Sequence, residues 1–215
     1  MTEVSREIRR KPHRSVEEME RIHAILEDAY VAHLGFNDPD TGEATVIPLG
    51  YVRDGDRLLF HGSTGSRLFM ALKSGVQVCA TITLLDGLVS ARSAFNSSMN
   101  YRSVMVFGVT TVLEESAKSD AMKALTEKLI PGLWTAGRPM TTKEFAATMI
   151  VSLPLDDVTA KQRKGEALDD EEDVSLEIWA GQIPIITKFG EPITNADSSH
   201  VPVPEYIKKV AAQND

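Results

Sequence analysis

A short run of small polar residues between positions 61 and 67 has the composition of an anion-binding turn. It contains the hydroxyls of Ser63, Thr64 and Ser66, two glycines and Arg67. The run follows a strand-like apolar segment and precedes a helical one. A helix start has free backbone N–H groups and a partial positive charge, which together attract anions. We interpret this turn as one half of a phosphate site; a plain helix cap beside a surface arginine is the alternative interpretation.

A second polar cluster lies at positions 100–103, immediately before an apolar strand-like run. Tyr101 and Ser103 supply hydroxyls there, and Arg102 supplies a positive charge. Because arginine pairs with phosphate through two parallel hydrogen bonds, Arg67 and Arg102 could hold one phosphate between them. We interpret the two clusters as halves of one phosphate-bearing cofactor site. His61, just before the first cluster, could line the cofactor, transfer a proton or simply pack at the strand end.

Composition narrows the class of protein. The chain has 215 residues, of which 42% are hydrophobic and 25% charged, as in an ordinary globular domain with extensions. The net charge of −8 argues against non-specific nucleic-acid binding. One cysteine excludes an intrachain disulfide, and the five scattered histidines predict no metal site. No apolar run reaches the roughly 18 residues of a membrane helix, and the charged start is unlike a signal peptide. We expect a cytoplasmic protein without a membrane partner.

The apolar periodicity predicts strands with helices inserted between them. A flexible basic arm over residues 1–14 precedes a helix that begins at Ser15, with Glu18 at capping-box spacing. Strands are expected over Tyr30–Asn37, Thr45–Val52, Arg57–His61, Val76–Leu85, Leu88–Phe95, Tyr101–Glu114 and Met149–Leu155. Helices are expected over Gly65–Ser74, over Lys118–Ile130, opened by Ser116 or Ser119, and over Thr141–Thr148. In the last of these, Glu144 stands at capping-box spacing from Thr141.

Turn residues and runs of charged residues predict the connections between these strands and helices. Asp54-Gly55 and Asp86-Gly87 each predict a hairpin turn, and Gly75 predicts a helix C-cap. The main domain covers residues 15–194 and contains a mobile acidic linker at 161–173, whose acidic run we take to be solvated. Residues 195–215 form a tail over the surface. Short strands joined by tight turns predict a closed antiparallel β-barrel with peripheral helices.

Five segments of the chain carry a family resemblance. They are VIPLGYV (Val46–Val52), LLFHGSTGSR (Leu58–Arg67), VCATITLLDGLVSARSAF (Val78–Phe95), MNYRSVMVFG (Met99–Gly108) and IWAGQIP (Ile178–Pro184). In this order and spacing they resemble the FMN-binding split barrels, the superfamily of pyridoxamine 5′-phosphate oxidase, and within it the nitroimidazole-resistance-like and flavin-nucleotide-binding branch. The resemblance implies a mainly β fold, a six-stranded antiparallel split barrel with peripheral helices. It also implies a homodimer that binds FMN in clefts between its subunits.

The resemblance also implies which residues contact the cofactor. The strand residues expected along the isoalloxazine ring are Ile47, Pro48, Leu49, Gly50 and Tyr51. The residues that match the ribityl- and phosphate-binding segment are His61, Gly62, Ser63, Ser66 and Arg67. Tyr101, Arg102 and Ser103 match the second cofactor segment. Trp179 matches a C-terminal tryptophan near the flavin, which reaches across the dimer.

One departure from the family limits the functional expectation. True pyridoxamine phosphate oxidases have an arginine and a histidine after the tryptophan, where this chain has Gly181-Gln182-Ile183-Pro184. We therefore expect an FMN-dependent oxidoreductase acting on another small molecule, with the flavin doing the chemistry and no catalytic side chain assigned. One alternative is a non-catalytic flavin- or haem-binding protein, with His61 as the haem ligand. The other is an F420-dependent reductase on the same fold.

Overall fold

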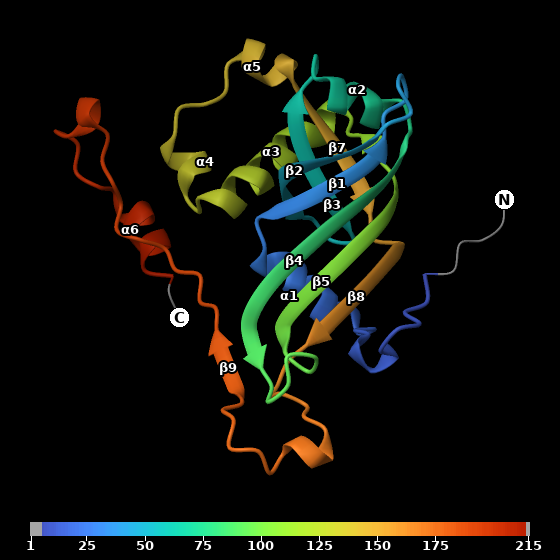
Figure 1. Cartoon of the computed structure of the whole chain (residues 1–215). Helices are drawn as coiled ribbons and strands as arrows, with labels where there is room; N and C mark the ends of the chain where they lie inside the picture. Colours follow the sequence, from blue (N-terminus) through green and yellow to red (C-terminus); the bar gives the residue numbers. More distant parts are fainter. Residues whose placement is uncertain (1–5, 214–215) are drawn as a thin grey trace.

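One curled antiparallel sheet forms the body of the protein in the computed structural model, which describes residues 6–213 (Figure 1). Over those residues the sheet has nine strands: β1 (Val31–Asn37), β2 (Ala44–Arg53), β3 (Arg57–Ser63), β4 (Gln77–Ser90), β5 (Ser98–Val109), β6 (Thr111–Val112), β7 (Thr148–Pro154), β8 (Asp157–Arg163) and β9 (Gly181–Pro184). The α-helices are α1 (Met19–Asp28), α2 (Arg67–Lys73), α3 (Glu115–Leu129), α4 (Leu133–Ala136), α5 (Thr142–Ala147) and α6 (Glu205–Ala211). Three short 3-10 helices are η1 (Pro12–Arg14), η2 (Glu171–Asp173) and η3 (Ala196–Ser198). The antiparallel sheet with peripheral helices agrees with the expectation, whereas the expected number of six strands is wrong.

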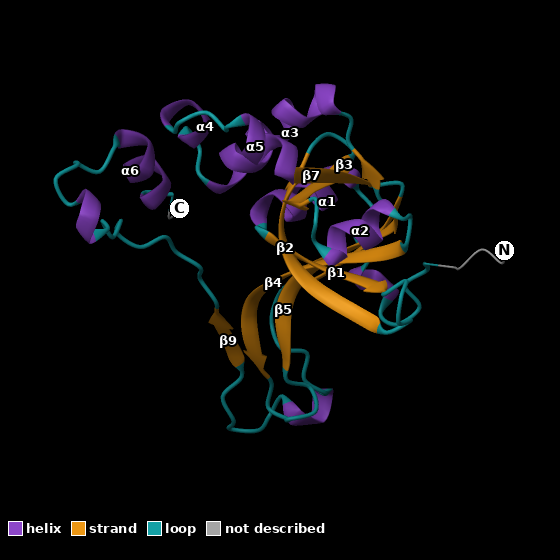
Figure 2. Ribbon diagram, turned by 90° about the horizontal axis from the view of Figure 1, so that it is seen from above, coloured by secondary structure: helices purple, strands orange, loops and turns teal. Residues whose placement is uncertain are grey.

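The sheet closes partly on itself. Its strand order is β6-β7-β3-β2-β1-β4-β5-β8, and β9 pairs with the far end of β4. Although β5 and β7 stand far apart in this order, an added Cβ at Gly108 of β5 would lie 3.2 Å from the Leu153 side chain of β7. This approach requires the sheet to curl into a half-barrel, as Figure 2 shows from above.

Two apolar clusters stabilise the curled sheet. The larger fills the inside of the curl, where Leu34, Phe60, Ile82 and Val104 from four strands meet the buried face of α1. The smaller lies on the other side of β3 and β7, under α3. Strand β7 is buried on both faces for this reason, which explains its continuous apolar sequence.

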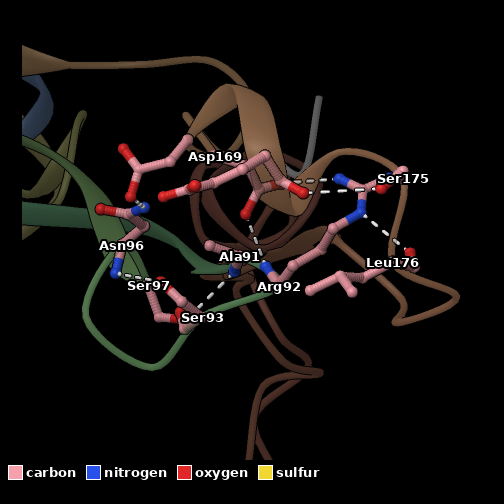
Figure 3. A network of polar contacts seen from close by, with 10 residues as sticks. Ala91, Arg92, Ser93, Asn96, Ser97, Asp169, Ser175 and Leu176 are labelled. Atoms are coloured by element: carbon pink, nitrogen blue, oxygen red, sulfur yellow. Dashed lines mark hydrogen bonds and ion pairs between the residues drawn. The ribbon is translucent and has the colours of Figure 1, made fainter.

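The long strands β4 and β5 give the molecule two different ends. We call the "α2 end" the part where β4 begins and β5 finishes, beside α2. We call the "β9 end" the part where β4 finishes and β5 begins, beside β9. At the β9 end the buried carboxylate of Asp169, whose side chain is 5% exposed, accepts hydrogen bonds from the backbone N–H and the guanidinium of Arg92, each at 2.7 Å (Figure 3). Asn96 donates to Asp170 in the same network.

Several local predictions are confirmed. Asp54-Gly55 lies in the β2–β3 turn, and Gly55 has the positive φ that such a turn requires. Gly75 follows α2 with φ of +84°, as a glycine after a helix C-terminus does. Thr141 caps α5, and Glu144 completes the capping box.

Asp86-Gly87 is not a hairpin turn. Both residues lie inside β4, which continues to Ser90, and the pairing with β5 shifts between Leu85 and Gly87 as in a β-bulge. The Asp86 side chain instead pairs with Arg102. An added Cβ at Gly87 would lie 2.9 Å from the Ile183 carbonyl of β9, so the glycine permits two backbones to approach closely.

The predicted linker at 161–173 is wrong in its first part. Residues 161–163 belong to β8, which pairs with β5 along the edge of the sheet. The expected solvated acidic run is also wrong at Asp169, because that carboxylate is buried against Arg92. Val174–Ala180 contains no strand, and the pairing with β4 begins only at Gly181.

The N-terminal part of the chain differs from the prediction as well. Residues 1–5 of the expected flexible arm lie outside the described residues. Arg6 stacks over the Phe107 ring at 3.7 Å and pairs with Asp157 of β8. Ser15 bridges to Lys161 instead of capping a helix, and α1 begins only at Met19. In the same way, α3 begins at Glu115 without a serine cap.

Candidate functional site

Strands β2 and β3 separate at the predicted cofactor residues. The two strands pair only from Tyr51 to Arg53 and from Leu58 to Phe60. Residues 47–50, expected to bind the flavin ring, lie on β2 just before Tyr51. Residues 61–63, expected to bind the ribityl chain and phosphate, lie on β3 just after Phe60. The fold therefore brings these two predicted segments to opposite sides of one opening in the sheet.

The opening leaves one edge of β2 without a partner strand. Residues 44–50 pair with β1 on one side only. In an antiparallel strand, alternate residues direct their backbone N–H and C=O groups to opposite edges. Pro48 has no N–H to donate, and proline occurs in sheets mainly in strands with an unpaired edge. The segment can therefore offer backbone groups to a ligand, as expected.

Side chains of β2 alternate between the core and the outer face of the sheet. Ile47 and Leu49 pack against the large core, whereas Pro48 and Gly50 are exposed. Tyr51 is buried, and its hydroxyl donates to the Leu26 carbonyl at 2.7 Å. Burial raises the pKa of Tyr51. The Tyr51 phenol thus belongs to the core, and only its backbone could contact a cofactor.

The hydroxyl-rich turn between β3 and α2 is folded as a helix start. Ser66 is the N-cap, and its hydroxyl accepts from the Phe69 N–H at 3.4 Å. The Ser63 hydroxyl accepts from the Gly65 N–H at 3.3 Å. Gly62 is required by packing, because an added Cβ would lie 2.1 Å from the Phe69 ring. Local structure therefore accounts for part of the small-residue pattern.

Arg67 is the exposed cation of this turn. Its side chain is 71% exposed and its Nη2 lies 3.0 Å from Oδ2 of the buried Asp38. Burial of Asp38 opposes ionisation, but N–H donors from Asp40 and Thr41, together with Arg67, lower the pKa of Asp38 below its ordinary value. Asp38 holds one side of the guanidinium, and the remaining N–H donors face solvent.

His61 lies on β3 beside the opening, with its side chain exposed. Burial of part of the imidazole lowers the pKa of His61. This shift favours the neutral ring, the form in which histidine accepts a proton or ligates a metal.

Arg102 does not join Arg67. Its guanidinium binds Asp86 through two nitrogens, at 3.0 and 2.8 Å, and also pairs with Asp28 of α1. The hydrogen bonds that Arg102 donates to Asp86 raise the pKa of Arg102, although burial opposes this, and Asp28 adds to the increase. Two carboxylates on one arginine leave a net negative charge, which disfavours a phosphate there.

The position of Arg102 also separates it from Arg67. Phe36, two residues before Asp38, pairs with Val78 of β4, whereas Arg102 pairs with Leu84, six residues further along. At the rise of a β-strand this is roughly 20 Å. The prediction that Arg67 and Arg102 of one chain hold one phosphate is therefore wrong.

Side chains alternate between the two faces of β5, so the residues of the second predicted segment, 101–103, point to different faces of the sheet. Arg102 faces the interior with Asn100 and Val104, while its neighbours Tyr101 and Ser103 face the outer side of the sheet. Ser103 lies 3.3 Å from the Thr83 hydroxyl there. The three consecutive residues cannot all line one surface.

Trp179 lies at the β9 end and is 64% exposed. It covers Gly181, where an added Cβ would lie 2.5 Å from the indole. Gly181 pairs with Ser90, at the opposite end of β4 from α2. Within one chain, Trp179 is therefore remote from the opening between β2 and β3.

The outer face of the sheet is the feature that sequence reasoning missed. Exposed apolar side chains on β2, β4 and β5 gather there, namely Val46, Leu85, Leu88 and Met105. His33 of β1 is exposed in the same row, paired with both Pro48 and Thr81. The alternation of β1 could have revealed His33, because its neighbours Ala32 and Leu34 are the buried ones.

Four cavities of a single chain lie away from the predicted cofactor residues. Their volumes are about 320, 510, 450 and 330 Å³, and none of these four is lined by a predicted cofactor residue. Within residues 6–213, no group of three histidine, cysteine or acidic side chains is placed to hold a metal ion. None of the helices in that part of the chain is long and apolar enough to cross a bilayer.

Comparison with known proteins identifies the family. The family model described as pyridoxamine 5′-phosphate oxidase matches residues 18–162. The chain belongs to the pyridoxamine 5′-phosphate oxidase-like family. This confirms the resemblance seen in the sequence, and the matched range includes every predicted site residue except Trp179. A comparison with curated protein sequences gave no match.

Solved structures give more specific relatives within this family. The flavocytochrome Anf3 from Azotobacter vinelandii is 38% identical, with 94% of each chain covered and a TM-score of 0.88. The FAD and haem binding protein from Mycobacterium smegmatis is 35% identical, with 92% of this chain and 97% of that chain covered and a TM-score of 0.87. A putative 5-nitroimidazole antibiotic resistance protein from Bacteroides thetaiotaomicron, 20% identical over 68% of this chain and 85% of that chain, shares the fold with a TM-score of 0.58.

Proposed function

We propose that this protein is a flavocytochrome-like protein that binds a flavin together with haem, and that the flavin is FAD. The observation that carries this proposal is the likeness, at 35% and 38% identity over more than nine-tenths of both chains, to a FAD and haem binding protein and to a flavocytochrome. The sequence alone favoured FMN and an enzyme acting on a small molecule. The two relatives support FAD and the haem-binding alternative instead.

The opening between β2 and β3 suits the flavin. The unpaired edge of segment 44–50 offers backbone donors and acceptors, which the polar edge of an isoalloxazine ring requires. The exposed guanidinium of Arg67 lies at the next turn, where it can bind a cofactor phosphate. Asp38 holds that guanidinium in place, and the other N–H groups of the guanidinium remain available to a phosphate.

A second copy of the chain would complete the site. In one chain, Tyr101 and Ser103 lie three strands away from segment 47–50, across β1 and β4, and Trp179 lies at the β9 end. The exposed apolar outer face is the kind of surface that associates with another protein. In a homodimer that joins two such faces, Tyr101, Ser103 and Trp179 of one copy would serve the opening of the other.

Two exposed histidines are candidates for the haem ligand. His61 stands beside the opening, and burial lowers its pKa, which favours the neutral form that ligates haem iron. His33 stands on the outer face, within the proposed dimer contact. A bound flavin would supply the electron or hydride chemistry, and these side chains would orient the cofactors.

Spectroscopy of the purified full-length protein tests the proposal. We expect a flavin band at roughly 450 nm and a haem band at roughly 400 nm, with FAD identified by mass spectrometry after acid release. Failure to bind FAD or FMN on reconstitution would overturn the proposal, and FMN alone would restore the original expectation. His33→Ala and His61→Ala should identify the ligand by loss of the haem band, with His200→Ala in the C-terminal tail as the control.

A further inference from the structure

A cationic cavity lies at the edge of the sheet, between η1, the approach to α1 and the end of β8. Its volume is about 320 Å³, which is within the range of small-ligand pockets. Figure 1 shows the N-terminal segment lying beside β8, and the Ser15–Lys161 bridge fastens the two together. The cavity shares no lining residue with the predicted flavin site.

Positive charge is concentrated in this cavity. Four of its lining residues are cations and one is acidic: Arg14, Arg21, Arg163, Lys164 and Glu166. Arg21 is paired with Glu18 at 3.2 Å. The side chains of Arg14 and Lys164 form no ion pair or hydrogen bond with the part of the chain that the structure describes. The protein as a whole has a net charge of −8, so this local excess is unusual for the chain.

Arg163 is the most constrained of these cations. It is 7% exposed, yet it binds only neutral oxygens: the Asn100 side chain and the carbonyls of Gly165 and Glu166. No carboxylate among residues 6–213 pairs with it. A buried charge without a counter-charge is costly, and an anion supplied from outside would relieve that cost.

The crowding of positive charges also affects the pKa values of Arg163 and Lys11. Burial lowers the pKa of Arg163, and Arg14 lowers it further. Arg14 is also the main cause of the lowered pKa of Lys11, with smaller contributions from burial, Arg10 and Arg163. Like charges are therefore held close together here in the absence of an anion.

We propose that this cavity binds a small polyanion, namely a phosphorylated or diphosphate-bearing metabolite, at a site separate from the flavin. A concave site of this size encloses a small molecule, and guanidinium groups pair well with phosphate. The acidic remainder of the protein disfavours an extended polyanion such as duplex DNA. The bound anion would provide the counter-charge that Arg163 lacks.

Calorimetric titration of the full-length, cofactor-loaded protein with inorganic pyrophosphate tests this proposal. We expect saturable binding with a dissociation constant below roughly 1 mM, weakening as salt is raised. The double variant Arg14→Ala/Lys164→Ala should bind at least about tenfold more weakly. The charge-matched control Lys143→Ala/Lys209→Ala, on α5 and α6, should bind like the unaltered protein.

Each opposing result has a distinct meaning. The absence of binding up to roughly 10 mM pyrophosphate would overturn the proposal. Equal losses in both double variants would show a non-specific charge effect, and tighter binding of duplex DNA than of pyrophosphate would indicate a nucleic-acid surface. A loss in Arg67→Ala would place the pyrophosphate at the flavin turn. The visible spectrum, which should be unchanged in Arg14→Ala/Lys164→Ala, reports separately on the proposed cofactors.

Discussion

The two ends of the long strands β4 and β5 are stabilised by different means. At the α2 end, Phe69 and Leu72 of α2 are buried in the large apolar core, and Arg67 remains exposed at the surface. At the β9 end, few apolar side chains are buried, and polar contacts such as Arg92–Asp169 connect the β4–β5 turn to the segment before β9. Because apolar packing secures α2, the α2 end can present the exposed guanidinium of Arg67 to a ligand.

The arginines Arg67 and Arg102 illustrate this difference. Arg67 has one carboxylate partner and a side chain that is 71% exposed, whereas Arg102 has two carboxylate partners and a side chain that is 25% exposed. A phosphate could bind Arg67 without breaking an intrachain contact. To bind Arg102 it would have to compete with Asp28 and Asp86. The same residue type is thus available to a ligand at one place and is held by the fold at the other.

The largest expected effect separates the two arginines directly. Arg67→Ala should weaken FAD or FMN roughly 10- to 100-fold, because a charge-assisted contact to phosphate is lost, while riboflavin affinity stays the same. Its unfolding free energy should change by less than about 1 kcal/mol, because Arg67 is largely exposed and the N–H donors of Asp40 and Thr41 remain on the buried Asp38. Arg102→Ala should instead lower the unfolding free energy by about 1–2 kcal/mol, because two carboxylates lose their partner.

Flavin titration by fluorescence and urea unfolding give both readouts for each variant. If Arg102→Ala weakened FAD much more than riboflavin while leaving stability unchanged, the distinction between the two arginines would be incorrect. Equal losses of FAD and riboflavin in Arg67→Ala would show that Arg67 does not bind the phosphate.

A smaller effect is expected at the β9 end. Asp169→Asn should destabilise this end by about 2 kcal/mol, because a largely buried ion pair with Arg92 is broken. Hydrogen exchange should become faster in residues 91–97 and 164–176 and remain slow in β3 and β7. Asp173→Asn, in the same acidic run but without a side-chain ion pair to the described residues, is the matched control and should have little effect. Uniform loss of protection over the whole sheet would contradict a separately stabilised β9 end.

The smallest effect concerns pH at the α2 end. The pKa of Asp38 is lowered in the folded protein, so ionised Asp38 stabilises the fold above its unfolded pKa of roughly 4. That contribution is lost as the pH falls through the lower, folded pKa. Asp38→Asn should therefore make urea unfolding less dependent on pH between roughly 6 and 2. Asp40→Asn serves as the control, and an unchanged pH dependence in Asp38→Asn would refute the role given to Asp38.

Local sequence signals predicted what depends on a few neighbouring residues. Thr141 and Glu144 form their capping box because both partners lie within one helical turn. Gly75 adopts a positive φ because the end of α2 requires it at that position. The segments 47–50 and 61–63 were placed on one site from the sequence, and the fold does bring them to one opening.

The predictions were wrong where the structure of a segment depends on residues that are distant in the sequence. Asp86-Gly87 has the composition of a turn, but Arg102 binds the aspartate and β9 approaches the glycine, so the strand continues through both. Strand β8 was missed because Lys161, Gln162 and Arg163 resemble a charged linker, although they pair with β5. Neither partner is visible in the local sequence.

By itself, the sequence determined the family and the antiparallel architecture with peripheral helices. Both follow from residue types and from spacings of only a few positions along the chain. Tertiary structure decided that Arg102 faces α1, that Tyr101 and Ser103 face the outer side, and that a cationic cavity forms beside β8. Strand alternation and sheet curvature cause this, because they determine the direction of each side chain and which distant residues it meets.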